Sequence, residues 1–273
     1  MSLLNPYESA RPVGRLAGRV RDLAGDRRAM AVMAALAAVL AFYSWTAVTS
    51  ARTFPTELDV GGRDYFNLLT DAFLHGQADL LVDPSPRLLA LDDPYDPAQN
   101  ITARLHDLSF YEGRYYMYWP PTPVLTLFLP GRVLLLGGDL PERAAIVIYL
   151  FVGLLIALAL LRYLVRRYLP GTPGWMLAMG GLALATANVA PYLLRRPTVY
   201  EVAISAGYCF TMAAVYLLLR GALEESGRWR RLLGGSVCLG LAIGARANLA
   251  VASARPASAS IQRGVPGRCR RTR

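Results

Sequence analysis

The sequence predicts an all-α membrane protein, a polytopic bundle of transmembrane helices with one amphipathic helix in an outer loop. Composition is the first reason, because the 273-residue chain is 54% hydrophobic and has a mean hydropathy of +0.32, which is more apolar than an ordinary soluble domain. Length is the second reason, because a helix needs about 20 apolar residues to cross a bilayer. Five runs are long enough, at 30–48, 144–161, 175–194, 199–219 and 232–252.

The first apolar run is predicted to be a signal anchor rather than a cleavable signal peptide. It follows 28 other residues, and it is about 19 residues long, whereas the apolar core of a signal peptide has about 7–15. We therefore expect residues 1–28 to form a cytoplasmic segment. Residues 29–252 would form the membrane domain, with an outer loop at 51–118.

A sixth apolar run, 119–137, contains prolines at positions 120, 121, 123 and 130. Proline interrupts helical hydrogen bonding, and irregular backbone is tolerated at membrane depth only where protein buries it. We expect this run to enter the membrane and return, or to lie at the interface. A full crossing is the alternative, and it would invert the topology of everything that follows.

The distribution of arginine predicts the orientation, because short loops rich in arginine stay in the cytoplasm. Arginine clusters precede the first run, follow the second at 162–167 and lie at 220–231. The outer loop instead holds eleven acidic residues and five arginines. Placing the three clusters inside leaves only Arg195 and Arg196 in short outer loops. The N-terminus is therefore expected in the cytoplasm and the acidic loop outside the cell membrane.

The outer loop carries a predicted amphipathic helix that begins after Asp64. An Asp at this position can accept hydrogen bonds from the first backbone N–H groups of the helix. Apolar residues then follow at helical spacing, and they are Tyr65, Leu68, Leu69, Ala72 and Phe73. Gly76 is the predicted end of this helix. We expect this helix to lie flat on the outer leaflet and to hold Asp64 near the membrane–water boundary. From the spacing alone, a helix cap is favoured over catalysis as the role of Asp64.

A second candidate cluster runs from Arg195 to Glu201, at the outer end of two predicted spans. Glu201 begins a helix, where the helix dipole stabilises negative charge. Arg195 and Arg196 run against the inward preference of arginine, so they are candidates for binding an anion such as a lipid phosphate. The alternative is that both side chains only extend to lipid headgroups. The residues favour neither reading over the other.

The net charge of +10 does not indicate nucleic-acid binding, because the last 19 residues hold six arginines and no acid. Residues 253–273 are predicted to form a disordered basic tail. We expect that the native reading frame is lost near Asn248, so that the tail is an out-of-frame read-through and the chain a truncated fragment. A genuine cytoplasmic tail that binds anionic lipid is the alternative.

Four short stretches together resemble the GT-C membrane glycosyltransferases. In chain order they read RDYFNLLTDAFLHGQ at 63–77, YYMYWPPTP at 115–123, RPTVYE at 196–201 and GLAIGARANL at 240–249. The likeness is to the bacterial branch related to protein mannosyltransferases and lipid A aminoarabinose transferases, and it covers about residues 29–250. It implies transfer of a sugar from a polyprenyl-phosphate donor to an acceptor in the cell envelope. That acceptor could be a glycan, a lipid or a protein.

The resemblance implies a catalytic role for the first outer loop. In that family an acid of this loop acts as general base or helps to bind a metal, and Asp64 is the matching position. Asp59 and Asp71 are its neighbours and are candidates for substrate binding. Asp64 is flanked by Arg63 and Tyr65 instead of a second acid, so this chain departs from the family's paired acidic motif. The departure puts a metal requirement in doubt.

The same resemblance implies roles for the second cluster. Arg195 or Arg196 would stabilise the departing phosphate of the donor, since cations stabilise developing negative charge. Glu201 would act with Asp64 at the catalytic centre, orienting the acceptor or a divalent cation such as Mg²⁺ or Mn²⁺. Tyr200 would contact the substrate.

Two other classes of function remain open at this point. A transporter or lipid-flipping protein would need polar residues deep within its spans, and the sequence shows few of them. A non-catalytic assembly protein of the membrane is the other alternative. It predicts that removing the charge of Asp64 has no effect.

Overall fold

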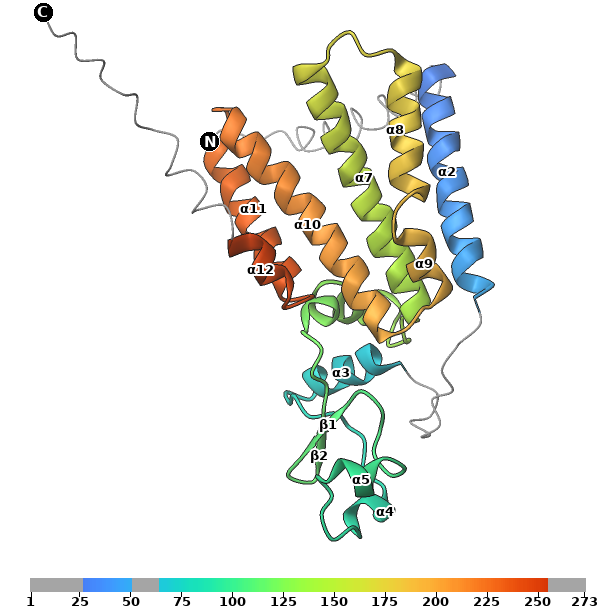
Figure 1. The fold of residues 1–273 in the computed structure, drawn as a ribbon, viewed down its shortest axis with the longest axis vertical. Helices are drawn as coiled ribbons and strands as arrows, with labels where there is room; N and C mark the ends of the chain where they lie inside the picture. The colour runs from blue at the N-terminus through green and yellow to red at the C-terminus, as the bar shows by residue number, and fades with distance from the viewer. Residues whose placement is uncertain (1–26, 51–63, 255–273) are drawn as a thin grey trace, which may run out of the picture. The chain divides into compact units, whose positions relative to one another are not determined.

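The computed structural model describes residues 27–50 and 64–254, and these residues form a helical bundle (Figure 1). The predicted all-α class is therefore confirmed. Four helical segments are long and apolar enough to cross a membrane, at Met30–Val48, Glu142–Tyr168, Gly174–Arg195 and Val199–Leu223. Most of the predicted cytoplasmic segment, the tail from residue 255 and Asp59 lie outside the described residues.

Helix α2, Arg27–Val48, contains the first predicted span. From Met30 onward it has no charged residue, and apolar residues occupy every side of it. A helix that is apolar all round suits a lipid environment. Its residues up to Trp45 belong to a separate unit of the chain.

Helices α7 (Glu142–Tyr168) and α10 (Val199–Leu223) pack against each other in the second unit. Glycine allows their backbones to approach closely, because a Cβ at Gly153 of α7 would lie only 2.5 Å from the ring of Tyr208 on α10. Small residues at helix crossings are typical of membrane bundles, where close packing replaces the hydrophobic effect as the main attraction.

The third predicted span is interrupted. Helix α8, Gly174–Thr186, is followed by the short helix α9, Ala190–Arg195. Between them the Asn188 side chain accepts a hydrogen bond from the Ala190 backbone N–H at 2.7 Å, which gives the first N–H of the second helix a partner.

The predicted fifth span is wrong as a single helix. Helix α11 covers only Arg228–Ile243, and a separate short helix, α12, covers Leu249–Ala254. The break begins at Gly244, whose carbonyl accepts a hydrogen bond from the Thr122 backbone N–H at 3.2 Å. A Cβ at Gly244 would lie 2.5 Å from the Thr122 hydroxyl. The described part of the chain therefore has four long apolar helices instead of five.

The proline-rich run forms a short helix that does not reach the length of a membrane crossing. It consists of a π-helical turn, η2 (Val124–Phe128), continued by α6 (Leu129–Leu134). Pro130 has no N–H to donate to the carbonyl four residues earlier, which explains a widened turn at this point. The chain then turns back through Leu136 and Gly137, both with positive φ.

Helix α3, Tyr65–Leu74, is the predicted outer-loop helix. Figure 1 shows it at the end of the bundle, between the long helices and the loop that follows. Much of its surface is buried against protein, and its predicted position on the outer leaflet stays a prediction. The buried residues are Phe66, Asn67, Leu68, Leu69, Thr70 and Ala72. Phe66 stacks on Phe128 of η2 with ring centroids 5.2 Å apart, which fixes α3 against the short helix.

The rest of the outer loop forms a small irregular lobe. It contains helices α4 (Pro86–Leu89) and α5 (Pro97–Asn100) and a hairpin of strands β1 (Ser109–Tyr111) and β2 (Arg114–Tyr116). The hairpin turns at Glu112 and Gly113, which both have positive φ, as a two-residue turn of this kind requires.

Candidate functional site

One end of the second unit brings together three segments that are far apart in the sequence. They are helix α3, the first residues of α7 and the first residues of α10. Asp64 accepts a hydrogen bond from the Glu142 N–H of α7, and the Tyr65 hydroxyl of α3 donates to the His106 carbonyl. Tyr200 of α10 donates to the adjacent Asp107, so the three segments are connected through residues 106 and 107. The two predicted clusters of functional residues therefore lie at the same end of the bundle.

Asp64 caps a helix, but not the helix predicted. It occupies the N-cap position of α3, where its side chain makes no capping hydrogen bond. Its Oδ2 instead accepts the backbone N–H of Glu142, the first residue of α7, at 3.0 Å. The orientation of this carboxylate is thus fixed by the start of a long helix, whose dipole also attracts negative charge.

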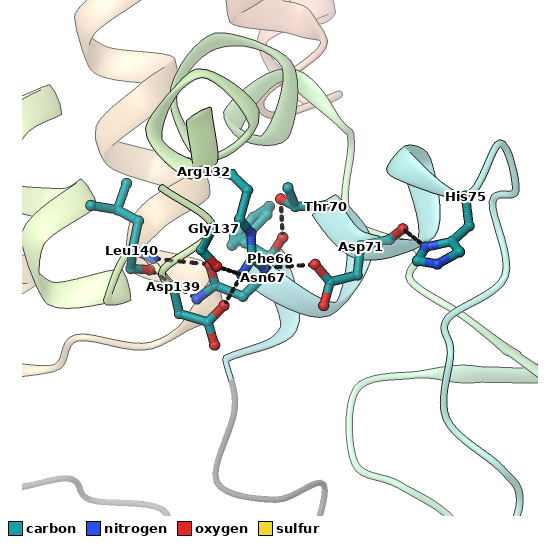
Figure 2. A network of polar contacts seen from close by, with 9 residues as sticks. All are labelled: Phe66, Asn67, Thr70, Asp71, His75, Arg132, Gly137, Asp139 and Leu140. Carbon is teal, nitrogen blue, oxygen red and sulfur yellow. Dashed lines mark hydrogen bonds and ion pairs between the residues drawn. The ribbon is translucent and has the colours of Figure 1, made fainter. Parts of the chain in front are cut away.

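A polar network lies along the same helix from Phe66 to His75 (Figure 2). Asn67 donates to the Leu140 carbonyl at 2.9 Å and accepts the Leu140 N–H at 3.1 Å. Asp71 pairs with Arg132 at 2.7 Å, and Arg132 also contacts Asp139 at 2.5 Å. Asp71 was predicted to bind substrate, but the structure places it in an ion pair that holds α3 to the segment before α7.

Asp107 is a candidate that the sequence did not single out. Its Oδ1 accepts hydrogen bonds from the Tyr200 hydroxyl at 2.8 Å and from the Tyr118 hydroxyl at 3.1 Å. His106 Nε2 lies 3.5 Å from its Oδ2. The backbone φ of Asp107 is +59°, a conformation that is uncommon for residues other than glycine and is enriched at functional sites.

Aromatic rings surround this carboxylate. The Trp119 ring centroid lies 4.2 Å from that of Tyr200 and 4.7 Å from that of Tyr118. The side chains of Tyr118 and Tyr200 are exposed, with relative accessibilities of 52% and 37%. We call Asp107, Tyr118, Trp119 and Tyr200 the aromatic–acid cluster. Tyr200, a predicted substrate-binding residue, is thereby brought together with Tyr118 and Trp119 of the stretch at 115–123 and with Asp107, which was not predicted.

The phenols near Asp107 stay protonated well into the alkaline range. Burial, followed by the negative charges of Asp107 and Glu142, raises the pKa of Tyr65 to about 12. The Tyr65 hydroxyl donates to the His106 carbonyl at 2.6 Å. Partial burial and the hydrogen bonds with Tyr200 and Asp107 also raise the pKa of Tyr118. Both hydroxyls therefore act as hydrogen-bond donors at neutral pH.

Glu201 is buried, with 4% relative accessibility, in the first turn of α10. Its carboxylate accepts a short hydrogen bond from the hydroxyl of Thr198, the N-cap residue of the same helix. This is a variant of the capping box, in which residues at these two positions stabilise a helix start. The structure shows this local role for Glu201.

The two predicted phosphate-binding arginines differ in their surroundings. The Arg196 guanidinium donates to the Tyr192 hydroxyl at 2.7 Å and lies over the same ring. Arg195 is exposed at the end of α9. Both lie at the end of the bundle that carries the aromatic–acid cluster.

A metal site is not evident in the described part of the chain. Among residues 27–50 and 64–254, no three His, Cys, Asp or Glu side chains come close enough together to hold a metal ion. The described residues by themselves do not provide a ligand set for a divalent cation. The predicted divalent metal and the predicted role of Asp59 in substrate binding stay predictions.

Comparisons with known proteins leave the family open. No family model matches the chain, and no curated protein or solved structure is significantly similar to it. The proposal that follows therefore depends on the residues and on their arrangement.

Proposed function

We propose that the chain is, or derives from, a membrane glycosyltransferase that takes a sugar from a polyprenyl-phosphate donor. The acceptor would lie outside the cell membrane, on the side of the acidic loop, with the N-terminus in the cytoplasm. One observation carries the proposal. The segment with Asp64 and the segment from Arg195 to Glu201 lie at the same end of the bundle, because Tyr65 bonds to the His106 carbonyl and Tyr200 bonds to the adjacent Asp107.

In the proposed reaction, an acceptor hydroxyl oxygen attacks the anomeric carbon of the donor sugar while the bond from that carbon to the phosphate oxygen breaks. The Asp64 carboxylate takes the proton of the hydroxyl, and the phosphate leaves on its polyprenyl chain. Positioned bases of this kind accelerate reactions by about 10²–10⁴-fold. The N–H of Glu142 supports this role because it fixes the carboxylate at the end of the bundle.

The other residues of this end would bind and position the reactants. Arg195 and Arg196 would attract the phosphate of the donor, since guanidinium groups pair well with phosphate oxygens. The buried Glu201 would orient the acceptor. Tyr200 would contact the substrate with its exposed ring.

The decisive test is the substitution Asp64→Asn in a complete protein. Asparagine retains a side-chain oxygen that accepts the Glu142 N–H, so the fold is kept while the base is lost. We expect transfer to envelope glycan, lipid or protein to fall by about 10²–10⁴-fold. Asp92→Asn is the matched control, because Asp92 is an exposed acid of the same loop. Undiminished transfer by the Asp64→Asn protein at normal expression would refute the proposal.

A further inference from the structure

The aromatic–acid cluster presents apolar faces and polar edges on one exposed surface. The side chains of Tyr118 and Tyr200 are exposed, and the Asp107 side chain keeps 15% of its accessibility between them. The cluster belongs to the outer loop and to the first turn of α10, so it lies at the end of the bundle and not along its apolar sides.

The spacing of the rings makes this surface a platform and not a cage. A cation held between aromatic rings lies within about 6 Å of each ring centroid, so the rings stand apart to admit it. Here Trp119 contacts Tyr200 edge to face at 4.2 Å, and Tyr118 lies 4.7 Å from Trp119. The rings fill the space between themselves, so a ligand can only lie on top of them.

The negative charge of the aromatic–acid cluster decides which kind of ligand can bind on its rings. The carboxylate of Asp107 and the acidic loop around it disfavour anions, including phosphates and nucleic acids. Carboxylate oxygens instead accept hydrogen bonds from hydroxyl groups, and these bonds are stronger than those between neutral groups. The indole N–H of Trp119 is shielded from solvent and has no acceptor among the described residues, so it is an unmet donor beside the platform.

We propose that the aromatic–acid cluster binds a neutral sugar ring of the acceptor, which makes the acceptor a glycan. A pyranose has apolar C–H faces that stack on aromatic rings, and its hydroxyl edge matches Asp107, Tyr118 and Tyr200. A lipid tail would leave the Asp107 carboxylate facing apolar atoms, which is costly. The assignment to the acceptor rests on the proposed transferase function, whereas sugar binding by the cluster does not depend on it.

Sugar binding is tested with the full chain in lipid nanodiscs that contain no sugar-headed detergent. Saturation-transfer NMR would probe methyl glycosides of mannose, glucose, galactose and arabinose, with choline as the cationic competitor. We expect a signal for at least one glycoside and a clear loss of it in Tyr118→Phe and Asp107→Asn. Phenylalanine keeps the ring, and asparagine tolerates the positive φ of residue 107. Tyr111→Phe is the matched control, since Tyr111 is an exposed tyrosine outside the cluster.

Each outcome has a distinct meaning. The absence of a signal with every glycoside, an equal signal in all variants, or binding of choline alone would overturn sugar binding at the cluster. In a transfer assay with a glycan acceptor, Tyr118→Phe should raise the KM for the acceptor by roughly 10-fold and leave kcat nearly unchanged. Asp64→Asn should keep the NMR signal. Sugar binding without any transfer would therefore overturn the proposed function alone, and an unchanged acceptor KM would overturn the assignment to the acceptor alone.

Discussion

Asp64 combines a structural contact with the proposed catalytic role, and the two can be separated by choice of substitution. Its Oδ2 accepts the first backbone N–H of α7, a group that has no partner within its own helix. We expect Asp64→Ala to lower stability by about 1 kcal/mol, as the loss of other helix caps does. The loss of stability in Asp64→Asn should be only a few tenths of that in Asp64→Ala, because asparagine keeps the oxygen that accepts the Glu142 N–H. Thermal unfolding of both variants in nanodiscs measures the difference, and equal losses would show that this hydrogen bond contributes little.

The raised pKa of Tyr65 predicts that the protein loses stability at alkaline pH. In the native protein the pKa of Tyr65 is raised to about 12, whereas an unfolded chain releases this proton near pH 10. The native state therefore binds the proton more tightly. The resulting stabilisation is complete below about pH 10 and is lost as the pH rises towards 12.

The substitution Tyr65→Phe checks this prediction. Unfolding midpoints followed from pH 9 to pH 12, a range chosen around the usual tyrosine pKa of about 10, should fall less steeply in the variant than in the parent. Tyr111→Phe is the control, since the Tyr111 side chain is exposed in the outer loop. If the two variants gave the same profile as the parent, the raised pKa of Tyr65 would not be a source of stability.

Single residues were only partly predictable from the sequence. The position of Asp64 at the start of α3 followed from local spacing, and the structure confirms it. Its actual partner did not follow, because Glu142 is 78 residues away. Asp107 was missed for the same reason, since Tyr200 is 93 residues further along the chain. Contacts between residues so far apart depend on the fold, and no local pattern of residues predicts them.

At the scale of elements, α3 is held by a stripe of polar contacts as well as by its apolar face. Asp64, Asn67 and Asp71 are spaced three and four residues apart, so they lie on one side of the helix. All three contact the segment from Arg132 to Glu142. The apolar spacing predicts the helix but gives no sign of this polar stripe. The stripe explains how α3 is docked on the rest of the protein.

Arg132 tests how firmly this element is docked. Its side chain is 13% exposed and lies between Asp71 and Asp139, so replacing it leaves two carboxylates close together. We expect Arg132→Gln to lower stability by about 2 kcal/mol, between the values for exposed and fully buried ion pairs. Asp71→Asn should cost less, because Asp139 and the Gly137 carbonyl still hold the guanidinium.

Thermal unfolding and limited proteolysis of the outer loop measure this effect. Arg104→Gln removes an exposed arginine from the same loop and should change stability by less than about 0.5 kcal/mol. A loss in Arg132→Gln no greater than in Arg104→Gln would mean that the apolar face alone docks α3.

The number and type of long helices were more predictable than their breaks. Apolar runs identified α2, α7, α8 with α9, and α10, because hydrophobic length is read directly from composition. The break after α11 was missed, although Gly244 was visible in the sequence. What decides it is the hydrogen bond from Thr122, which belongs to a helix start over a hundred residues earlier. A glycine in a helix permits a break, but its presence alone does not predict one.

At the scale of the whole molecule, the long helices of the second unit run alternately away from and back to the end that carries α3. Helix α7 leads away from the end that carries α3, and α10 begins again at that end beside Asp107. One helical segment, Gly174–Arg195, makes the return between them. The arginine pattern predicts that the outer loop lies outside the cell, and on that proposal the loops at 169–173 and 224–227 are cytoplasmic.

Accessibility to a membrane-impermeant thiol reagent tests this arrangement. After replacement of Cys209, Cys238 and Cys269, single cysteines are introduced at exposed positions, as Thr102→Cys and Arg195→Cys at one end and Gly171→Cys at the other. We expect the first two to be labelled in intact cells and Gly171→Cys only after permeabilisation. Both outer positions must behave alike, because the Tyr200–Asp107 contact places their segments at the same end.

The pattern of labelling separates two kinds of error. If all three positions reversed, the bundle would be correct but inverted in the membrane, and the acceptor would have to be cytoplasmic. If Thr102→Cys and Arg195→Cys were labelled from opposite sides, the arrangement of the helices would itself be wrong. Asp64 and Glu201 could then not serve one reaction, because a bilayer core of about 30 Å would separate them.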